Sequence, residues 1–106
     1  MDTDNIFLNI PPELKTEHFQ DLFKNNSIRI ERIISKGHSS PASGWYDQSE
    51  NEWVIVLKGS GAIAFADGHE VNLTTGDFIF IPKHQKHRVS WTDPENITVW
   101  LAVFYK

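Results

Sequence analysis

Cysteine is absent from the 106-residue sequence, which excludes disulfides, thiolate metal ligands and thiol nucleophiles together. No apolar run approaches the roughly 20 residues of a membrane-spanning helix, and the N-terminus lacks a basic segment followed by an apolar one. Positive charge is scarce: 10 Lys and Arg stand against 14 Asp and Glu, for a net charge of −4. The sequence therefore offers no basic surface for nucleic acid or acidic membranes. We expect a cytoplasmic protein that binds neither.

The apolar residues, 40% of the chain, are enough for one folded core. Most of them fall in short extended runs separated by Gly, Pro and Asp-Gly signals, without an internal repeat or a long linker. This pattern is typical of an antiparallel sandwich or barrel. The runs that we interpret as strands cover residues 28–34, 53–57, 62–66, 69–73, 78–81, 88–92 and 97–105.

The N-terminal part has a different pattern. Leu14, Phe19, Leu22 and Phe23 form an approximately helical stripe, which predicts one short helix over residues 13–24. We therefore divide the chain into two parts. An N-terminal extension with this helix covers residues 1–26, and a β-barrel covers residues 27–106.

The run from Trp53 to Leu57 is apolar on both side-chain parities, which predicts a strand with protein on both faces. Glu52 stands at the head of this strand. By the two-residue period it points to the same side as Val54 and Val56, into the protein. A buried carboxylate is costly without a partner, so finding the partner of Glu52 is the functional question.

Two spaced motifs suggest a family. Glu52 is followed after six residues by Gly59, and Gly76 is followed by Pro82 and then His87. Over nearly half of the chain this pattern resembles the cupin superfamily. The resemblance implies an all-β, antiparallel double-stranded β-helix, that is, a jelly-roll or cupin barrel, here with one short N-terminal helix. It also implies that Glu52 and His87 face each other inside the barrel.

Metal-binding cupins carry a His-x-His pair just before the glutamate, and both histidines are replaced here, by Tyr46 and Gln48. A first hypothesis is nevertheless a divalent Zn, Mn, Fe or Ni ion held by Gln48, Glu52 and His87. His84 is an alternative third ligand, if it turns inward. Open coordination positions would allow Lewis-acid or dioxygen chemistry, so the sequence leaves open whether the protein is an enzyme.

A second hypothesis is a metal-free pocket for a small molecule, built as ligand sites usually are from a few polar groups and apolar walls. The polar candidates are Tyr46, Gln48, Glu52, His84 and His87. The candidate walls are Trp45, Trp53, Trp91, Trp100 and Phe80. A third hypothesis is structural: Glu52 and His87 form a satisfied buried pair without chemistry.

The strands that are apolar on both faces exceed what one small barrel can bury. Either the N-terminal segment or a second subunit must then cover one face. We therefore expect a homodimer through sheet faces or edges.

Overall fold

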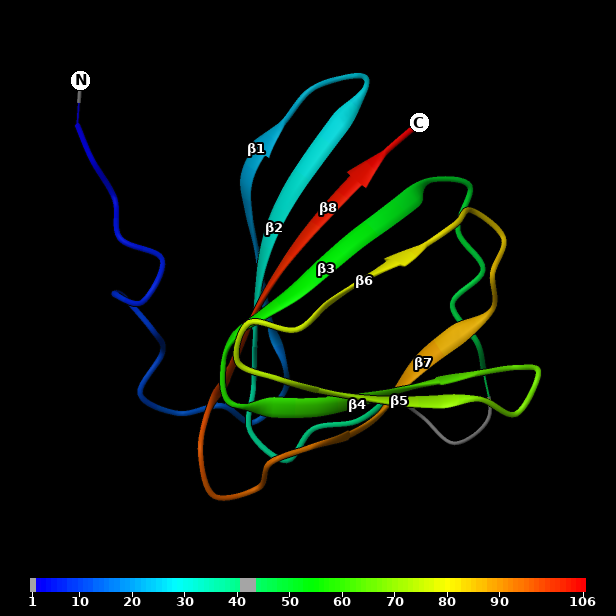
Figure 1. Cartoon of the computed structure of the whole chain (residues 1–106). Coiled ribbons are helices and arrows are strands. Elements are labelled where there is room, and N and C mark those ends of the chain that lie inside the picture. Colours follow the sequence, from blue (N-terminus) through cyan, green and yellow to red (C-terminus); the bar gives the residue numbers. More distant parts are fainter. Residues whose placement is uncertain (1, 41–43) are drawn as a thin grey trace.

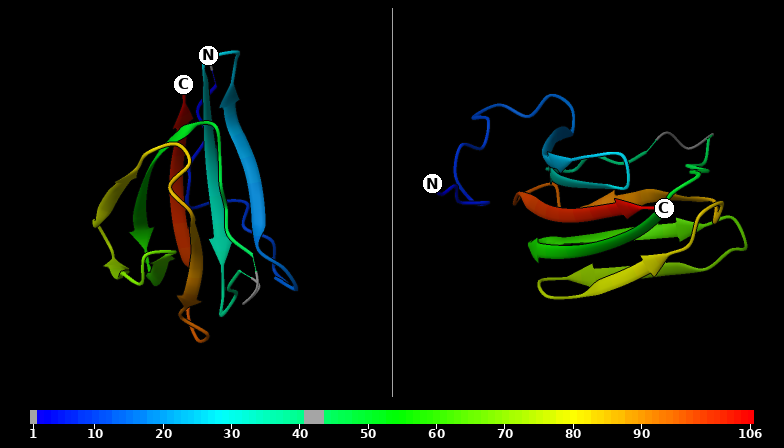
Figure 2. Two further views of the ribbon diagram at one scale, coloured as in Figure 1. Left: turned by 90° about the vertical axis from the view of Figure 1, so that its right-hand side faces the viewer. Right: turned by 90° about the horizontal axis from the view of Figure 1, so that it is seen from above.

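The computed structural model describes residues 2–40 and 44–106, and these form eight strands in two antiparallel sheets (Figure 1). The strands are β1 (His18–Lys24), β2 (Ile28–Ser35), β3 (Asn51–Lys58), β4 (Ser60–Phe65), β5 (Glu70–Thr74), β6 (Phe78–Ile81), β7 (His87–Thr92) and β8 (Thr98–Tyr105). One sheet has the order β1-β2-β8-β3-β6 and the other β5-β4-β7. Figure 2 shows the two layers from the side and from above. The prediction of an all-β, antiparallel double-stranded β-helix is confirmed.

The predicted helix over residues 13–24 is wrong, because most of this segment is the edge strand β1, which pairs with β2. Phe19, Leu22 and Phe23 are each about half exposed, so they do not form the one buried stripe that a surface helix needs. Asn25 makes the turn between the strands, and its Oδ1 accepts backbone hydrogen bonds beyond the turn. The described part of the chain contains no helix, and thus none that could cross a membrane.

The segment before β1 runs outside the sheets (Figure 2). The buried guanidinium of Arg32, on β2, donates hydrogen bonds to the carbonyls of Ile6, Leu8 and Asn9 at 3.1, 2.7 and 3.3 Å. These bonds hold the segment against the outer face of β2. The boundary predicted at residue 26 lies in the β1–β2 turn, and the division of the chain there stays a prediction.

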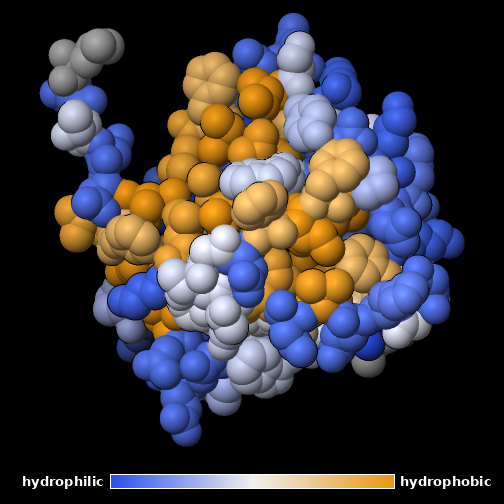
Figure 3. Space-filling view, in the orientation of Figure 1, coloured by the Kyte–Doolittle hydropathy of each residue, from blue (hydrophilic) through white to orange (hydrophobic). Residues whose placement is uncertain are grey.

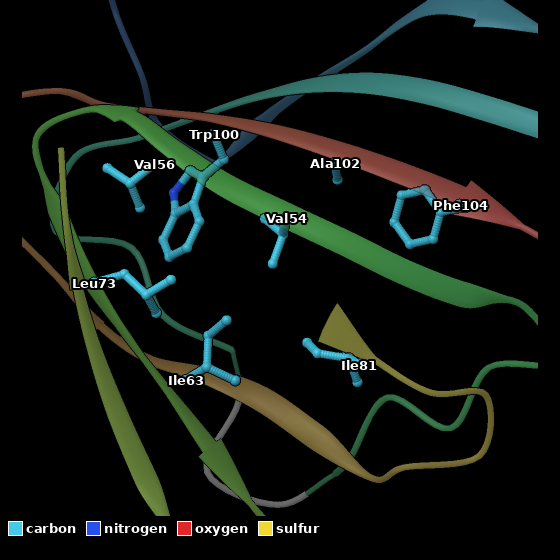
Figure 4. Close-up of a cluster of buried hydrophobic side chains, with 8 residues drawn as sticks. All are labelled: Val54, Val56, Ile63, Leu73, Ile81, Trp100, Ala102 and Phe104. Atoms are coloured by element: carbon cyan, nitrogen blue, oxygen red, sulfur yellow. The ribbon is translucent and has the colours of Figure 1, made fainter. Parts of the chain in front are cut away.

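The core lies between the two sheets, where inward side chains of β3, β6 and β8 meet those of β4 and β5 (Figure 4). Its buried residues are Val54, Val56, Ile63, Leu73, Ile81, Trp100, Ala102 and Phe104. The β3–β4 connection explains Gly59: its φ is +94°, and a Cβ there would lie 2.6 Å from the Ile97 carbonyl oxygen. Only glycine fits this turn without strain.

The molecular surface carries large hydrophobic areas over its strands (Figure 3). The register of β3 with β6 and β8 places Trp53, Phe78, Phe80 and Tyr105 on the outer face of the five-stranded sheet, opposite to the core. Phe78 and Phe80 are 63% and 49% exposed. The N-terminal segment is bound to β2, so these four aromatic residues keep an open apolar face.

Candidate functional site

A cavity of about 560 Å³ opens between the sheets, within the usual size range of small-molecule sites, roughly 300–1,000 Å³. Inward side chains of β1, β2, β3, β4, β7 and β8 line it, together with the loop before β3. The lining residues are Glu17, Phe19, Arg29, Glu31, Ile33, Tyr46, Asp47, Gln48, Ser49, Glu50, Glu52, Val54, Ile63, His87, Val89, Trp100 and Phe104.

Glu52 and His87 meet in this cavity from opposite sheets. Glu52 lies near the start of β3 and His87 at the start of β7. Glu52 Oε1 and His87 Nε2 are 3.3 Å apart, with side chains only 10% and 7% exposed. His87 Nδ1 lies 2.8 Å from the Gln85 carbonyl oxygen, which can only accept a hydrogen bond, so Nδ1 carries the ring proton. Nε2 of the neutral ring therefore turns its lone pair toward Glu52.

The environment raises the pKa of His87. Burial opposes the charged imidazolium, but the Glu52 carboxylate and the Gln85 carbonyl favour it and outweigh burial. Because Nδ1 is already protonated, an added proton goes to Nε2, between the ring and Glu52 Oε1. The pair can therefore hold one proton and pass it to or from a bound group.

Two buried oxygens in the cavity have no hydrogen-bond donor among the described residues: Gln48 Oε1 and Glu52 Oε1. His87 Nε2 lies within ion-pair distance of Glu52 Oε1, but in the neutral ring the proton is on Nδ1, so Nε2 has no hydrogen to donate. The indole Nε1 of Trp100 is likewise buried without an acceptor in the described chain. Buried polar atoms are nearly always paired, so each unpaired atom here requires an explanation.

The neighbouring charges are mostly negative. Arg29 Nη1 lies 2.8 Å from Glu31 Oε2, and Nη2 lies 3.4 Å from Glu50 Oε1. Burial raises the pKa of Glu31; Arg29 counteracts this, while Asp21 and Glu52 add to it. The guanidinium of Arg29 is therefore shared between two carboxylates, and Glu52 lies beside one of these acids, Glu31.

The structure brings four of the five predicted polar residues to the cavity. Gln48, Glu52 and His87 lie inside, while Tyr46 lies at the rim, 43% exposed, and its backbone pairs with that of His87. His84 does not line the cavity, contrary to the expectation that it could turn inward. Its Nδ1 lies 2.9 Å from Asp47 Oδ1, and its side chain is 65% exposed.

Residues 46–50 belong to the loop before β3, which begins only at Asn51. Of the aromatic walls predicted for the pocket, only Trp100 contacts the cavity. Trp45, Trp91 and Phe80 are 42%, 47% and 49% exposed. Ala62 pairs with Trp91 and Ile63 pairs with Val89, so a register shift interrupts the regular alternation of β7 between Val89 and Trp91.

Arg29 and Glu31 are cavity residues that sequence reasoning missed. Charges alternate with isoleucines over residues 28–34, a pattern that is also typical of a strand with one face in water. The register with β8 instead places them opposite Phe104 and Ala102, on the inner side. Arg29 and Glu31 are two residues apart, so they point to the same side of the strand. Opposite charges on one side of a strand are the signal that could have indicated a polar cavity.

A metal site of the type that the resemblance implies does not fit the donor set. Within residues 2–40 and 44–106, no three His, Cys, Asp or Glu side chains come together as metal ligands. The third ligand of the predicted set would be the amide oxygen of Gln48, which is a weaker ligand than the imidazole or thiolate of ordinary zinc sites.

A two-sheet antiparallel barrel with an inward glutamate on one sheet and an inward histidine on the other defines a protein of the double-stranded β-helix class. The model of the Cupin domain family matches residues 31–104, and the chain belongs to this family. The match begins within β2, includes β3 to β7 in full, and ends within β8.

Solved structures extend this comparison. A protein from Ralstonia eutropha JMP134, provisionally named a mannose-6-phosphate isomerase, is 40% identical over 100% of this chain and 99% of its own, with a TM-score of 0.94. A cupin superfamily protein from Desulfitobacterium hafniense DCB-2 is 16% identical over 91% of this chain and 83% of its own, with a TM-score of 0.76. An RmlC-like cupin from Methanocaldococcus jannaschii is 18% identical over 91% and 85%, with a TM-score of 0.73. The last two show the fold alone. A comparison with curated proteins gives no match.

Proposed function

We propose that the cavity between the sheets binds a small organic molecule without a metal. The observation that carries this proposal is the pair of buried acceptors without donors, Gln48 Oε1 and Glu52 Oε1. An unsatisfied buried polar atom costs about 1–3 kcal/mol, and a ligand that donates hydrogen bonds to both oxygens removes this cost. The cavity is also large enough for such a ligand and has apolar walls beside the polar groups.

Nuclear magnetic resonance of the ¹⁵N-labelled protein tests this with a library of small metabolites. We expect chemical-shift changes confined to cavity signals, including the side-chain amide of Gln48 and the indole N–H of Trp100. Gln48→Ala should weaken the binding. The matched control is Gln20→Ala, an exposed glutamine on β1 outside the cavity. If no cavity signal responds to any member of a broad library, the structural hypothesis of a satisfied Glu52–His87 pair is preferred.

A divalent ion held by Gln48, Glu52 and His87 is a second candidate. The orientation of the His87 ring favours it, because metal-bound histidines typically donate their other N–H to a carbonyl, as Nδ1 does here to Gln85. The number of ligands argues against it, since only two of the three side chains are strong donors. We therefore prefer the metal-free site.

The provisional name of the Ralstonia eutropha protein suggests a further candidate, the isomerisation of a sugar phosphate. The Glu52–His87 pair would supply the proton transfer that such a reaction needs. An assay of mannose 6-phosphate with the wild-type protein and His87→Gln tests this candidate. Activity that is lost in the variant would support it.

We also infer that the protein is a homodimer through the outer face of β3, β6 and β8. The aromatic residues exposed there form a neutral apolar surface of the kind that monomeric proteins rarely leave in water. A twofold axis would bring this face of one subunit against the same face of its partner.

A further inference from the structure

We propose that the ligand of the cavity is a small organic cation, an alkylammonium ion, held by the oxygens of Glu52 and Gln48. This inference rests on the proposed function and specifies its ligand class. The charges of the cavity, the hydrogen-bonding capacity of the two oxygens and the nature of the walls each support it.

The charge of the cavity lining is strongly negative. Five carboxylates line it against one guanidinium; the acids are Glu17, Asp47, Glu31, Glu50 and Glu52. Arg29 is already placed between two of them, and His87 faces Glu52. Among the described lining residues no cation remains for an anionic ligand. A phosphate would add like charge to a partly buried region, where repulsion is screened much less than in water.

The hydrogen-bonding capacity of the unpaired oxygens points the same way. An ionised carboxylate only accepts hydrogen bonds, and so does the oxygen of an amide. An ammonium group only donates them, with up to three N–H bonds, so it matches carboxylate and amide oxygens without bringing an acceptor that would need its own donor. Hydrogen bonds from a cation to a carboxylate are also roughly twice as strong as neutral ones.

The apolar walls of the cavity suit the alkyl part of an alkylammonium ion. Val54, Ile63 and Val89 provide an apolar surface for a short alkyl chain. The ring of Phe104 also accommodates a cation in the protein itself, because the guanidinium carbon of Arg29 lies 3.9 Å from its centroid. A ligand with one ammonium head and a short apolar body therefore matches both parts of the cavity.

Three probes with one alkyl chain and different heads test the inference: n-butylamine, n-butanol and n-butyl phosphate. Each is titrated into the full ¹⁵N-labelled chain at pH 8 with EDTA, so that the amine is charged and stray metal is removed. We expect saturable shifts at cavity residues with butylamine, and an affinity about tenfold or more above that of butanol. Butyl phosphate should cause no saturable shift.

Glu52→Gln should weaken butylamine binding about tenfold or more, because it removes the charge from the stronger acceptor. The matched control, Glu95→Gln, removes the same charge from an exposed loop outside the cavity and should leave binding unchanged. If Glu52→Gln does not fold, Gln48→Ala replaces it, with an expected loss of about fivefold.

The outcomes separate this inference from the proposed function. Butanol or butyl phosphate binding at the same residues as tightly as butylamine overturns the cation and leaves the small-molecule site standing. Butylamine binding that is unchanged in both cavity variants also overturns it. If none of the three probes shifts a cavity signal at high millimolar concentration, the cation proposal fails, while the proposed function fails only if the metabolite library also leaves every cavity signal unchanged.

Discussion

Replacing Glu52 by glutamine should destabilise the protein at low pH but not at high pH. The folded pKa of His87 is raised above its usual 6.5. The stabilisation by the imidazolium is therefore complete below pH 6.5 and disappears as the pH rises through the folded value. Glutamine carries no charge, so it can accept a hydrogen bond from the imidazolium but cannot form an ion pair with it. Its amide can, however, donate a hydrogen bond to the Nε2 lone pair of the neutral ring.

The expected size follows from the burial of the pair. At pH 5.5 the variant must either bury an unpaired imidazolium, a change of about 3–5 kcal/mol for a broken buried ion pair, or keep His87 neutral. Neutrality one unit below pH 6.5 costs about 1.4 kcal/mol, so the protein takes the second route. With the lost charged contact included, we expect Glu52→Gln to lower the free energy of unfolding by about 1.5–3 kcal/mol. At pH 8.5 we expect no loss, or a gain of up to about 1 kcal/mol.

Urea unfolding followed by tryptophan fluorescence measures both values at one fixed protein concentration, which matters if the protein is a dimer. Glu95→Gln, with an exposed side chain, controls for the change of net charge and should differ little from wild type at either pH. An equal effect of Glu52→Gln at pH 5.5 and pH 8.5 would refute the assignment of a shared proton to Glu52 and His87.

Three further predictions address the metal, the core and the subunit contact. After incubation with Zn, Mn, Fe or Ni and desalting, mass spectrometry should find well under one metal per chain; a stoichiometric metal that is lost in His87→Ala would contradict the metal-free site. Gly61→Ala should lower stability by about 1–3 kcal/mol in urea unfolding, because a Cβ there would lie within 2.7 Å of Cη2 of the buried Trp100 ring; an unchanged midpoint would show that the ring can move. Sedimentation equilibrium should find a dimer that Phe80→Glu converts to a monomer; a wild-type monomer would refute the contact through the outer face.

The barrel strands could be predicted because each is bounded by a strong local signal. Gly59 ends β3 with a positive φ that other residues rarely adopt, and Gly68 and Gly76 also have positive φ in the turns that the sequence indicated. The N-terminal segment lacks such a signal. The apolar residues of β1 fit a helical stripe as well as a strand, and pairing with β2 decides between the two. That contact depends on the register of a distant strand, which local pattern does not contain.

The sequence could predict that Glu52 and His87 form the centre of the site, but not which residues surround them. Glu52 and His87 follow from strand parity and motif spacing, which do not depend on loops. Arg29 and Glu31 required knowing which face of β2 is turned inward, and this is set by the pairing of β2 with β8. The position of Trp91 depends on a bulge in β7, and a one-residue irregularity reverses the side of every residue beyond it.

The shared proton also makes a prediction about ligand binding. Glu52 faces His87 across the cavity and lies near Glu31, whose own partner is Arg29, so its remaining partner is either the His87 proton or a bound cation. An ammonium ion that binds Glu52 should therefore displace the proton from His87. The affinity for butylamine should be constant above the folded pKa of His87 and fall by up to about tenfold per pH unit below it. Calorimetry in two buffers of different ionisation enthalpy measures the released proton directly. Binding that strengthens toward low pH, or that releases no proton below this pKa, would show that the cation and the imidazolium do not compete for Glu52.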